Sequence, residues 1–455
     1  MFALPVSHFL HSRNIHYAWV VAAVTFFAML TTSAALGLPG AMLKPLSAEF
    51  GWSISQLSSV FAVRFALFGL IGPFAAVCLA RYGVRKVMLV AAACIASALI
   101  LAIHISALWQ LFVLWGLLLG TGTGLTALVL GAIVANRWFT ARRGLVVGVL
   151  AASTATGQLL FLPLAAWLIE HVGWRFALLP VVIAVLLSAC AVWLLMEDRP
   201  QDLGLLPFGE ARPAAQSSDA EGLPMPMGAG SGSAARSATA ASAATTGTQD
   251  FGTPFRILRD VSGNQTFWIL AGTFFICGLS TSGLVQTHFI SLCGDRGLSA
   301  VPAAGVLALM GAFDLVGTTA SGILSDRFDN RKLLFWYYGL RGLSLFWLPF
   351  STFSLYGLSV FAMFYGLDWI ATVPPTVKLC SAAFGRERSG MLFGWIFAAH
   401  QLGSAVAAYG AGLSRTYLLT YSPALFAGGS ACLVAAVVIF GITRPNVAKP
   451  AMTAG

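Results

Sequence analysis

The amino-acid sequence predicts an all-helical membrane protein with twelve transmembrane helices in two pseudo-symmetric six-helix bundles and both termini in the cytoplasm. Three observations lead to this fold class: the composition, the length of the apolar runs and an internal repeat. Of the 455 residues, 58% are hydrophobic and only 9% are charged, and the mean hydropathy is +0.84. Soluble proteins usually carry about 25% charged residues. So few charges cannot cover a water-soluble fold of this length, and part of the surface must therefore face lipid.

Twelve apolar runs are long enough to cross the hydrocarbon layer, which takes about 20 helical residues. A chain inside a bilayer must pair its own backbone polar groups, and a helix does so within one segment. The predicted spans are residues 18–40, 56–79, 87–105, 109–135, 144–169 and 174–196, followed by 266–292, 301–324, 333–350, 355–377, 390–413 and 423–442.

Lys and Arg residues predict the orientation of the spans, because short cytoplasmic loops carry an excess of them. With a cytoplasmic N-terminus, 20 of the 24 basic residues in the termini, the loops and the outermost ends of the spans lie in cytoplasmic segments. The four on the other side are Lys44, Arg175, Arg296 and Arg415. We therefore expect the N-terminal segment 1–17 and the tail 443–455 to be cytoplasmic.

Residues 197–263 separate a first six-helix bundle, 18–196, from a second one, 264–442. Between residues 211 and 252 this segment is nearly all Ala, Ser, Gly, Thr and Pro, a composition that cannot form an apolar core. It predicts a flexible cytoplasmic linker. The end of the linker, at Phe255–Asp260, is a candidate for a short amphipathic helix at the membrane surface.

The two bundles match each other at an offset of 246 residues. Basic residues and glycines coincide in the loops after the second and the fourth span of each bundle. The matched pairs are Arg81 and Arg327, Arg85 and Arg331, Lys86 and Lys332, Arg142 and Arg388, Gly144 and Gly390, Gly148 and Gly394, and Gly157 and Gly403. Two loops that match at one offset indicate a duplicated unit, related by an axis along the membrane normal.

The segment GILSDRFDNRKL at 322–333 resembles the loop signature of the major facilitator superfamily: a glycine, then Asp-Arg, then a basic pair. The residues concerned are Gly322, Asp326, Arg327, Arg331 and Lys332. The resemblance extends over nearly the whole chain outside the linker and the termini. The first copy, AVCLARYGVRKV, has Ala76 and Ala80 where the family usually has Gly and Asp. In the family this acidic residue helps to latch the cytoplasmic side, so the resemblance implies a weaker latch in the first bundle.

Two other segments, EFGWSISQLS at 49–58 and GLDWIATVPPT at 366–376, resemble bacterial carriers near the monocarboxylate and oxalate–formate branch of that superfamily. The resemblance implies a multi-pass protein of a bacterial inner membrane, with a central cavity lined by the first, fourth, seventh and tenth helices. The basic residue that monocarboxylate carriers place in the first span is absent. Their aspartate in the eighth span is usually followed by Arg one turn later, whereas Asp314 is followed by Thr318.

Four charged residues remain inside the predicted spans: Arg64, Asp314, Arg341 and Asp368. A charge at the centre of a bilayer costs roughly 2.5–3.5 kcal/mol on insertion scales, so these residues are expected to face the bundle interior or a hydrated cavity. At a rise of 1.5 Å per residue, Arg64 lies about 25 Å from Arg81 and well away from the cytoplasmic face. Asp314 and Arg341 lie at depths of roughly 18 and 14 Å on consecutive antiparallel helices, so they could pair.

Candidate substrate-binding residues follow from hydrogen-bonding chemistry. A guanidinium matches a carboxylate in shape and charge, which makes Arg64 the first candidate for binding an organic anion. Arg341, Gln158 and His400 are further candidates within the spans. The alternative for each is a structural contact between helices, and for Arg341 a permanent salt bridge is the preferred interpretation.

Asp314 and Asp368 are the candidates for proton coupling or gating. A carboxylate removed from water favours its neutral form, and a nearby cation reverses this preference. A cation that approaches or leaves during transport could therefore switch proton binding. Asp368 also precedes Pro374 and Pro375, which remove backbone hydrogen bonds and bend the helix.

The sequence contains no nucleotide-binding loop, nucleophile elbow or zinc motif. We therefore predict a secondary active transporter rather than an ATP-driven pump or an enzyme, without cofactor, metal or nucleic-acid partner. The predicted substrate is a small organic anion, most simply a carboxylate, moved with a proton by a monomer. An efflux carrier of drugs or metabolites is the first alternative, and it would need an unpaired carboxylate in the cavity. A membrane sensor without transport, or a polytopic membrane enzyme, is the second.

Overall fold

The computed structural model describes residues 5, 12–13, 15–126, 128–210 and 250–442. Its regular elements within these ranges are helices, apart from one isolated bridge between Phe139 and Phe208. The first helix group comprises α2 (Ala18–Phe50), α3 (Ile54–Tyr82), α4 (Val84–Ala102), α5 (Leu108–Leu111), η1 (Phe112–Leu119), α6 (Gly120–Leu125), α7 (Leu128–Trp138), α8 (Arg143–His171) and α9 (Trp174–Leu195).

The second helix group follows two short linker helices, η2 (Pro200–Leu203) and α11 (Thr253–Val261). It comprises α12 (Gln265–Gly278), η3 (Leu279–Gln286), α13 (Thr287–Asp295), α14 (Ala300–Arg327), α15 (Asn330–Trp347), η4 (Leu348–Phe350), α16 (Leu355–Asp368), α17 (Val373–Phe384), α18 (Arg386–Tyr417), α19 (Ser422–Val438) and η5 (Ile439–Gly441).

In the described part of the chain, eleven helical segments are long and apolar enough to cross a membrane. They overlap eleven of the predicted spans, and the all-helical class is confirmed. The remaining predicted span, 333–350, falls on α15, which has 18 residues but carries the three basic residues Arg331, Lys332 and Arg341. The count of twelve therefore stays a prediction.

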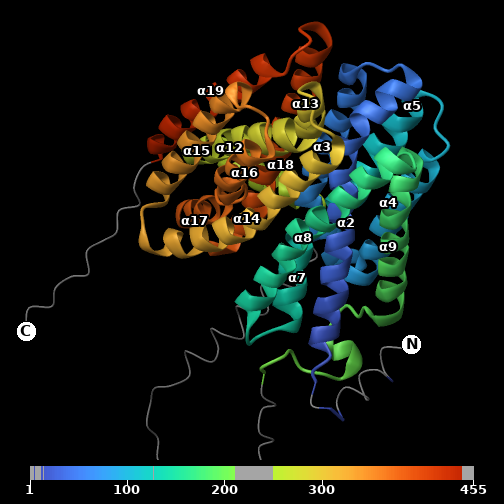
Figure 1. Ribbon diagram of the computed structural model, residues 1–455. Coiled ribbons are helices and arrows are strands. Elements are labelled where there is room, and N and C mark those ends of the chain that lie inside the picture. The colour runs from blue at the N-terminus through green and yellow to red at the C-terminus, as the bar shows by residue number, and fades with distance from the viewer. Residues whose placement is uncertain (1–4, 6–11, 14, 127, 211–249, 443–455) are drawn as a thin grey trace, which may run out of the picture.

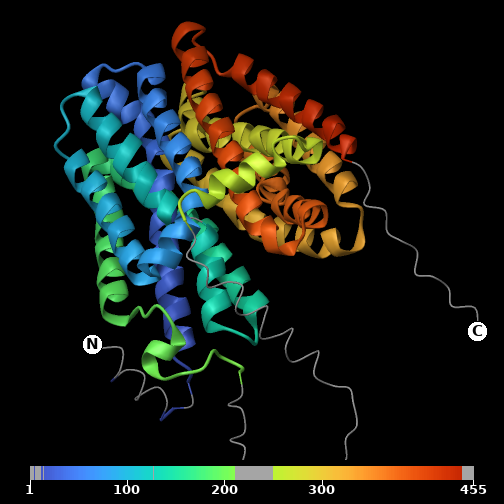
Figure 2. The ribbon, with the colours of Figure 1, turned by 180° about the vertical axis from the view of Figure 1, so that it is seen from behind.

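The two helix groups lie side by side, with α3 against α18 and α8 against α14 (Figures 1 and 2). We call the end of the molecule at which α2 begins and residues 197–210 lie the linker end, and the opposite end the distal end. The groups lie together at the distal end and diverge towards the linker end (Figure 1).

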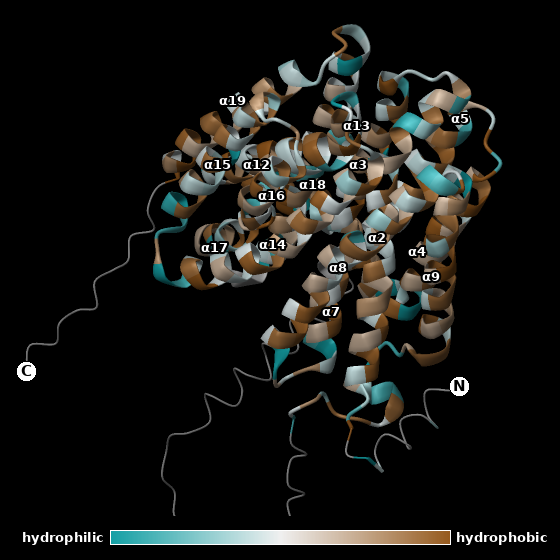
Figure 3. Cartoon of the chain, in the orientation of Figure 1, coloured by the Kyte–Doolittle hydropathy of each residue, from teal (hydrophilic) through white to brown (hydrophobic). Residues whose placement is uncertain are grey.

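Hydrophobic residues, coloured brown in Figure 3, predominate along the helices of both groups. Leu187, Val316 and Val437 are between 58% and 66% exposed, in helices whose other faces are buried. Such a surface is far more apolar than water-soluble proteins expose, and it matches the lipid contact that the composition requires.

Glycines allow several helices to touch backbone to backbone, as is common in membrane bundles. A Cβ added at Gly278 would lie 1.8 Å from His400 O, and one at Gly403 would lie 1.9 Å from Phe275 O. These two glycines bring α12 and α18 together. Gly317 does the same for α14 and α16, since its Cβ would lie 1.9 Å from Leu367 O.

The two copies of the basic loop cap the helix that follows them with different carboxylates. In the second copy, Asp329 Oδ1 accepts a hydrogen bond from Arg331 N at 3.0 Å. The matching position in the first copy is Gly83, whose φ of +88° suits glycine and disfavours aspartate. There Asp198, just after α9, accepts from Arg85 N at 2.9 Å, and its Oδ2 lies 2.3 Å from where a Gly83 Cβ would be. A carboxylate from the start of the linker thus fills the space of the missing side chain.

Both described ends of the predicted linker make defined contacts. Phe208 N donates to Trp138 O at 2.8 Å, and Trp395 Nε1 of α18 donates to Pro254 O at 3.0 Å. The apolar residues Leu203, Leu205 and Phe208 pack against the first group. They are few, and they directly precede the low-complexity stretch, so the sequence gives little indication of this packing. The expected short helix at Phe255–Asp260 is confirmed as α11. Residues 211–249 and the tail 443–455 lie outside the described residues.

Replacing Asp198 by Ala should lower the free energy of unfolding of the first group by about 1 kcal/mol, the usual cost of losing a helix cap. Asp198→Asn should keep most of the stability, because an amide oxygen can still accept from Arg85 N. Thermal unfolding of the purified protein in detergent measures the effect, with exposed Asp260→Ala as the matched control. Equal melting temperatures for Asp198→Ala and the control would contradict the capping role.

Candidate functional site

A cavity lies between the two helix groups. Its lining comes from α2, α3, α6 and α8 on one side and from α12, η3, α14 and α18 on the other, with the segment between α16 and α17. The polar lining residues are Thr32, Ser33, Thr123, Thr126, Thr154 and Gln158 of the first group, and Cys277, Thr281, Ser282, Gln286, Asp314, Thr372, His400 and Gln401 of the second.

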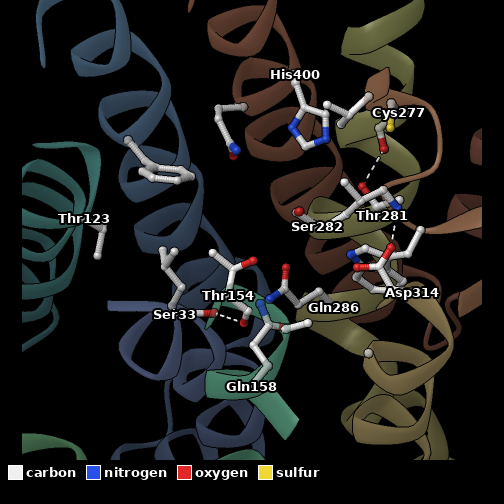
Figure 4. A pocket seen from close by; sticks show the side chains of 18 of the residues that line it. Ser33, Thr123, Thr154, Gln158, Cys277, Thr281, Ser282, Gln286, Asp314 and His400 are labelled. Atoms are coloured by element: carbon white, nitrogen blue, oxygen red, sulfur yellow. Dashed lines mark hydrogen bonds between the residues drawn. The ribbon is translucent and has the colours of Figure 1, made fainter. Parts of the chain in front are cut away.

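Asp314 is the one carboxylate among these lining residues. Its Oδ1 accepts two hydrogen bonds of 2.9 Å, from Thr318 Oγ1 one turn along α14 and from Ile370 N. No ion pair joins it to a cation of the described chain, although the side chain is only 4% exposed. Figure 4 shows it on the second-group wall of the cavity, on the same side as Thr281 and Ser282.

The Ile370 N–H is available because the helix is interrupted at residues 369–372, which we call the break turn. Pro374 and Pro375 in the first turn of α17 have no N–H to donate to the carbonyls of residues 370 and 371. Ser321 of α14 donates instead to Ala371 O at 2.6 Å. Asp314, Gly317 and Ser321 share one face of α14, so this face fits the interrupted backbone.

Arg341 of α15 occupies the other side of the break turn. Its Nη2 donates to Asp368 O at 2.5 Å and to Trp369 O at 3.3 Å, and its Nε pairs with Asp368 Oδ2 at 2.7 Å. Nη1 donates to Cys277 Sγ at 2.9 Å. The guanidinium therefore satisfies the carbonyls at the C-terminal end of α16, where the helix dipole favours a cation.

The structure pairs Arg341 with Asp368 and not with Asp314, the partner that the sequence predicts as possible. The number of residues along each helix predicts similar depths in the membrane for Arg341 and Asp314. Depth alone does not determine the direction in which a side chain points. Neither Arg341 nor Asp368 lines the cavity. Both are buried behind Cys277 and Trp369, which do line it.

His400 and Gln401 of α18 line the cavity with buried polar atoms that have no partner in the described chain. These atoms are His400 Nδ1 and Gln401 Oε1. The His400 ring lies parallel to the Phe397 ring, with the two centroids 5.8 Å apart. The centroid of the His400 ring lies 4.8 Å from that of the Phe274 ring. Gln158 faces them from α8 of the first group and packs over Gly37.

Arg64 of α3 is 2% exposed and lies behind Leu36 and Phe65, which line the cavity. Its Nη1 donates to Leu36 O at 3.0 Å, its guanidinium carbon lies 4.5 Å from the centroid of the Phe65 ring, and its Nε has no partner. No acidic residue of the described chain pairs with it. It is thus a buried cation without a counter-anion, one side chain away from the cavity.

None of the loop-motif residues lines the cavity. Asp326 pairs with Lys378 of α17, and Arg331 donates to Ile442 O at 2.9 Å as well as to Asp329. The other predicted members of the two loops are Gly322, Arg327, Lys332, Arg81, Arg85 and Lys86. In the first copy, Arg85 donates to Trp193 O.

Contacts between the helix groups close the cavity at the distal end. Asp295, at the end of α13, pairs with Lys44 Nζ of the first group at 3.0 Å and with Arg415 Nε at 2.6 Å. Glu170 Oε1 of α8 accepts from Ala300 N at 2.7 Å, in the first turn of α14. Towards the linker end the two helix groups diverge (Figure 1).

Sequence reasoning missed much of the polar lining. Thr32, Ser33, Ser282 and Gln286 sit within apolar runs but carry no charge, and a charge-based search passes over them. Gln286 gave the clearest signal, since a glutamine inside a predicted span is costly unless it has polar contacts. The π-helical η3, which carries Thr281, Ser282 and Gln286, has no recognisable signature in the sequence.

Comparison with known proteins identifies the fold. Residues 22–408 match the family described as the Major Facilitator Superfamily. The chain belongs to this superfamily. It is therefore a multi-pass integral membrane protein of a transporter family, as the loop motif indicated.

Several superfamily members resemble the chain over most of its length. YcxA of Bacillus subtilis (strain 168), described as an uncharacterised transporter of the superfamily, is 24% identical over 428 residues, or 91% of this chain and 94% of YcxA. Monocarboxylate transporter 13 of Rattus norvegicus is 24% identical over 434 residues, or 94% of this chain and 89% of the relative. The crystal structure of a D-xylose–proton symporter has the same fold, with a TM-score of 0.68, 16% identity and coverage of 93% and 97% of the two chains.

Replacing Arg341 by Ala should lower the free energy of unfolding by about 3–5 kcal/mol, because a buried carboxylate and two carbonyls lose their partner. The double variant Arg341→Met/Asp368→Leu should lose less, since no isolated charge remains. Thermal unfolding in detergent checks both. A double variant that is less stable than Arg341→Ala would contradict this expectation. It would show that the pair adds to the free energy of unfolding by more than the neutralisation of its two charges.

Proposed function

We propose that this protein is a secondary active transporter that moves a small organic acid, as its carboxylate, together with a proton across a bacterial inner membrane. The observation that carries the proposal is Asp314, a carboxylate without a cation on the wall of a cavity between two helix groups. Its position against the break turn adds support, because interrupted helices mark the ion and substrate sites of many transporters.

The linker end is the cytoplasmic side in this proposal, because cytoplasmic loops carry an excess of basic residues and the basic loop around Arg85 contacts Asp198 there. Helix α15 is then the twelfth span, and the two helix groups are the six-helix bundles that rock about the cavity. With its distal end closed by Asp295 and Glu170, the structure represents the inward-facing state. Movement to the outward-facing state requires the Lys44–Asp295 pair to separate.

Proton coupling is assigned to Asp314 rather than to Asp368. Asp368 has a permanent cation in Arg341, whereas Asp314 has hydrogen bonds only from Thr318 and Ile370. A proton on Asp314 removes the cost of a carboxylate out of water, and it can leave when water or a charge reaches the site. Asp314, the proposed coupling residue, therefore lies on the same wall of the cavity as the break turn.

Arg64 is assigned to the substrate carboxylate. A buried guanidinium with an unpartnered Nε has a strong tendency to bind an anion, and it needs a small displacement of Leu36 or Phe65 to reach the cavity. An anion between Arg64 on the first group and protonated Asp314 on the second would draw both groups inward, because the neutral carboxyl group donates a hydrogen bond to the anion. The similarity to monocarboxylate transporters supports an acid as the substrate.

A carrier of organic cations is the second candidate, and one observation favours it. No cation lines the cavity among the described residues, and Asp314 is free to bind a protonated amine. This candidate makes Arg64 a structural residue. A flux assay with both ligand classes separates the two, and it also tests whether the protein transports at all rather than acting as a sensor.

Asp314→Asn should abolish proton-driven accumulation of a radiolabelled carboxylate in proteoliposomes with an inward proton gradient. The amide can still accept from Ile370 N but cannot carry the proton. Exchange of internal for external substrate, which needs no net proton movement, should survive. Asp260→Asn, an exposed linker variant, is the control. Undiminished accumulation by Asp314→Asn would remove the residue from coupling.

Arg64→Gln should raise the KM for a transported carboxylate by roughly 10- to 100-fold, the equivalent of losing a charge-assisted hydrogen bond. The uptake of a cationic substrate, if there is one, should not change. Initial rates in proteoliposomes give the KM, with Arg259→Gln on the exposed face of α11 as control. An unchanged KM would place Arg64 outside the substrate site and favour the cation carrier.

A further inference from the structure

One end of the cavity is walled by aromatic rings from three helices. Phe68 of α3 meets Phe397 of α18 edge to face, with centroids 5.6 Å apart. Phe397 lies parallel to His400, which in turn contacts Phe274 of α12 at 4.8 Å. All four rings line the cavity, and together they form a continuous ring wall that reaches from the first helix group to the second.

Two unpartnered polar atoms accompany the ring wall. Gln401 is 3% exposed, and its Oε1 has no hydrogen bond in the described chain. Nδ1 of His400 is also buried without a partner. Gln401 is held at the close crossing of α3 and α18, where a Cβ at Gly69 would lie 2.5 Å from its Cβ. Buried polar groups nearly always find a partner, so these atoms indicate a ligand group that completes them.

The other parts of the lining differ in chemistry. Ser33, Thr154 and Gln158 of the first group and Ser282 and Gln286 of the second supply hydroxyl and amide groups. In Figure 4, His400 projects into the cavity at one end of the view and Gln158 at the other. The cavity therefore has an aromatic end and a polar end, each with side chains from both helix groups.

The position of the ring wall also bears on the size of the substrate. An acid of three or four heavy atoms would leave the ring wall untouched. A planar ring stacked on the wall would use it, because offset-stacked and edge-to-face ring pairs are favourable beyond the area that they bury.

We propose that the substrate is an aromatic acid whose ring lies against Phe68, Phe274, Phe397 and His400, with a ring hydroxyl or N–H that donates to Gln401 and the carboxylate at the polar end. This inference rests on the proposed transport of organic acids and names the class of acid. The ring wall spans both groups, so a bound ring contacts each of them. The substrate itself then bridges the two groups in the transport cycle.

The test is calorimetric binding to the purified protein with matched probes. Benzoate and cyclohexanecarboxylate have the same charge and nearly the same size, and they differ in aromaticity. Benzoate should bind roughly three- to tenfold more tightly, as expected for a ring stacked on rings. Phe397→Leu should abolish this preference, and Phe346→Leu, whose ring packs on Phe426 away from the cavity, should retain it.

A second pair of probes tests Gln401. The ring hydroxyl of 4-hydroxybenzoate should improve binding over benzoate by about two- to tenfold, the value of one hydrogen bond. Gln401→Met should remove this gain, so that the variant binds benzoate and 4-hydroxybenzoate with similar affinity, whereas Gln401→Glu, which keeps an acceptor, should preserve the ratio between the two probes. A gain that persists in Gln401→Met would overturn the assignment of Gln401.

Benzylamine and cyclohexylmethylamine separate this inference from the proposed function. If only the amines bind and benzylamine is preferred, the acid substrate is wrong and the ring site stands. If acids bind without preference for a ring, the transport proposal stands and the aromatic assignment is overturned. Absence of binding by every aromatic probe at millimolar concentration also overturns it.

Discussion

A helix that is interrupted inside a membrane leaves backbone N–H and C=O groups without hydrogen-bond partners. The side chains that supply these partners at the break turn determine which charges the site contains. Arg341 donates hydrogen bonds to the carbonyls at the end of α16. Asp314 accepts one from the N–H of Ile370, in the break turn that precedes α17. Opposite charges thus lie at opposite helix ends, as the helix dipoles require. Because Asp368 neutralises Arg341, Asp314 alone of the three remains without an ion-pair partner. The charge on the cavity wall follows from the way in which the backbone is satisfied.

Most of the fold could be predicted because each helix must by itself meet the length and polarity of the bilayer. The loop motif then identified the family, as the match over residues 22–408 confirms. The span at 333–350 was harder, because the three basic residues of α15 lower its apolarity while the structure uses Arg341 internally. The ends of the linker were harder still, since their few apolar residues find partners only in the three-dimensional arrangement.

The candidate site could be predicted only in part. Asp314, Gln158 and His400 line the cavity, and each stood out as a polar residue in an apolar run. The pairing of Arg341 with Asp368 depends on how each helix is rotated about its own axis. Counting residues along a helix predicts only the depth of a side chain in the membrane. The aromatic residues of the lining gave no signal, because phenylalanines inside a membrane span are as often in contact with lipid as with a cavity.

Asp198 fastens the beginning of the connecting segment to the first helix group, while the end of that segment is fastened to the second by the Trp395 indole on Pro254. Each group therefore carries its own anchor, and neither anchor depends on the low-complexity stretch between them. A chain severed between residues 211 and 249 would keep one of these two anchors on each fragment, so each helix group would retain the attachment of its own end of the connecting segment.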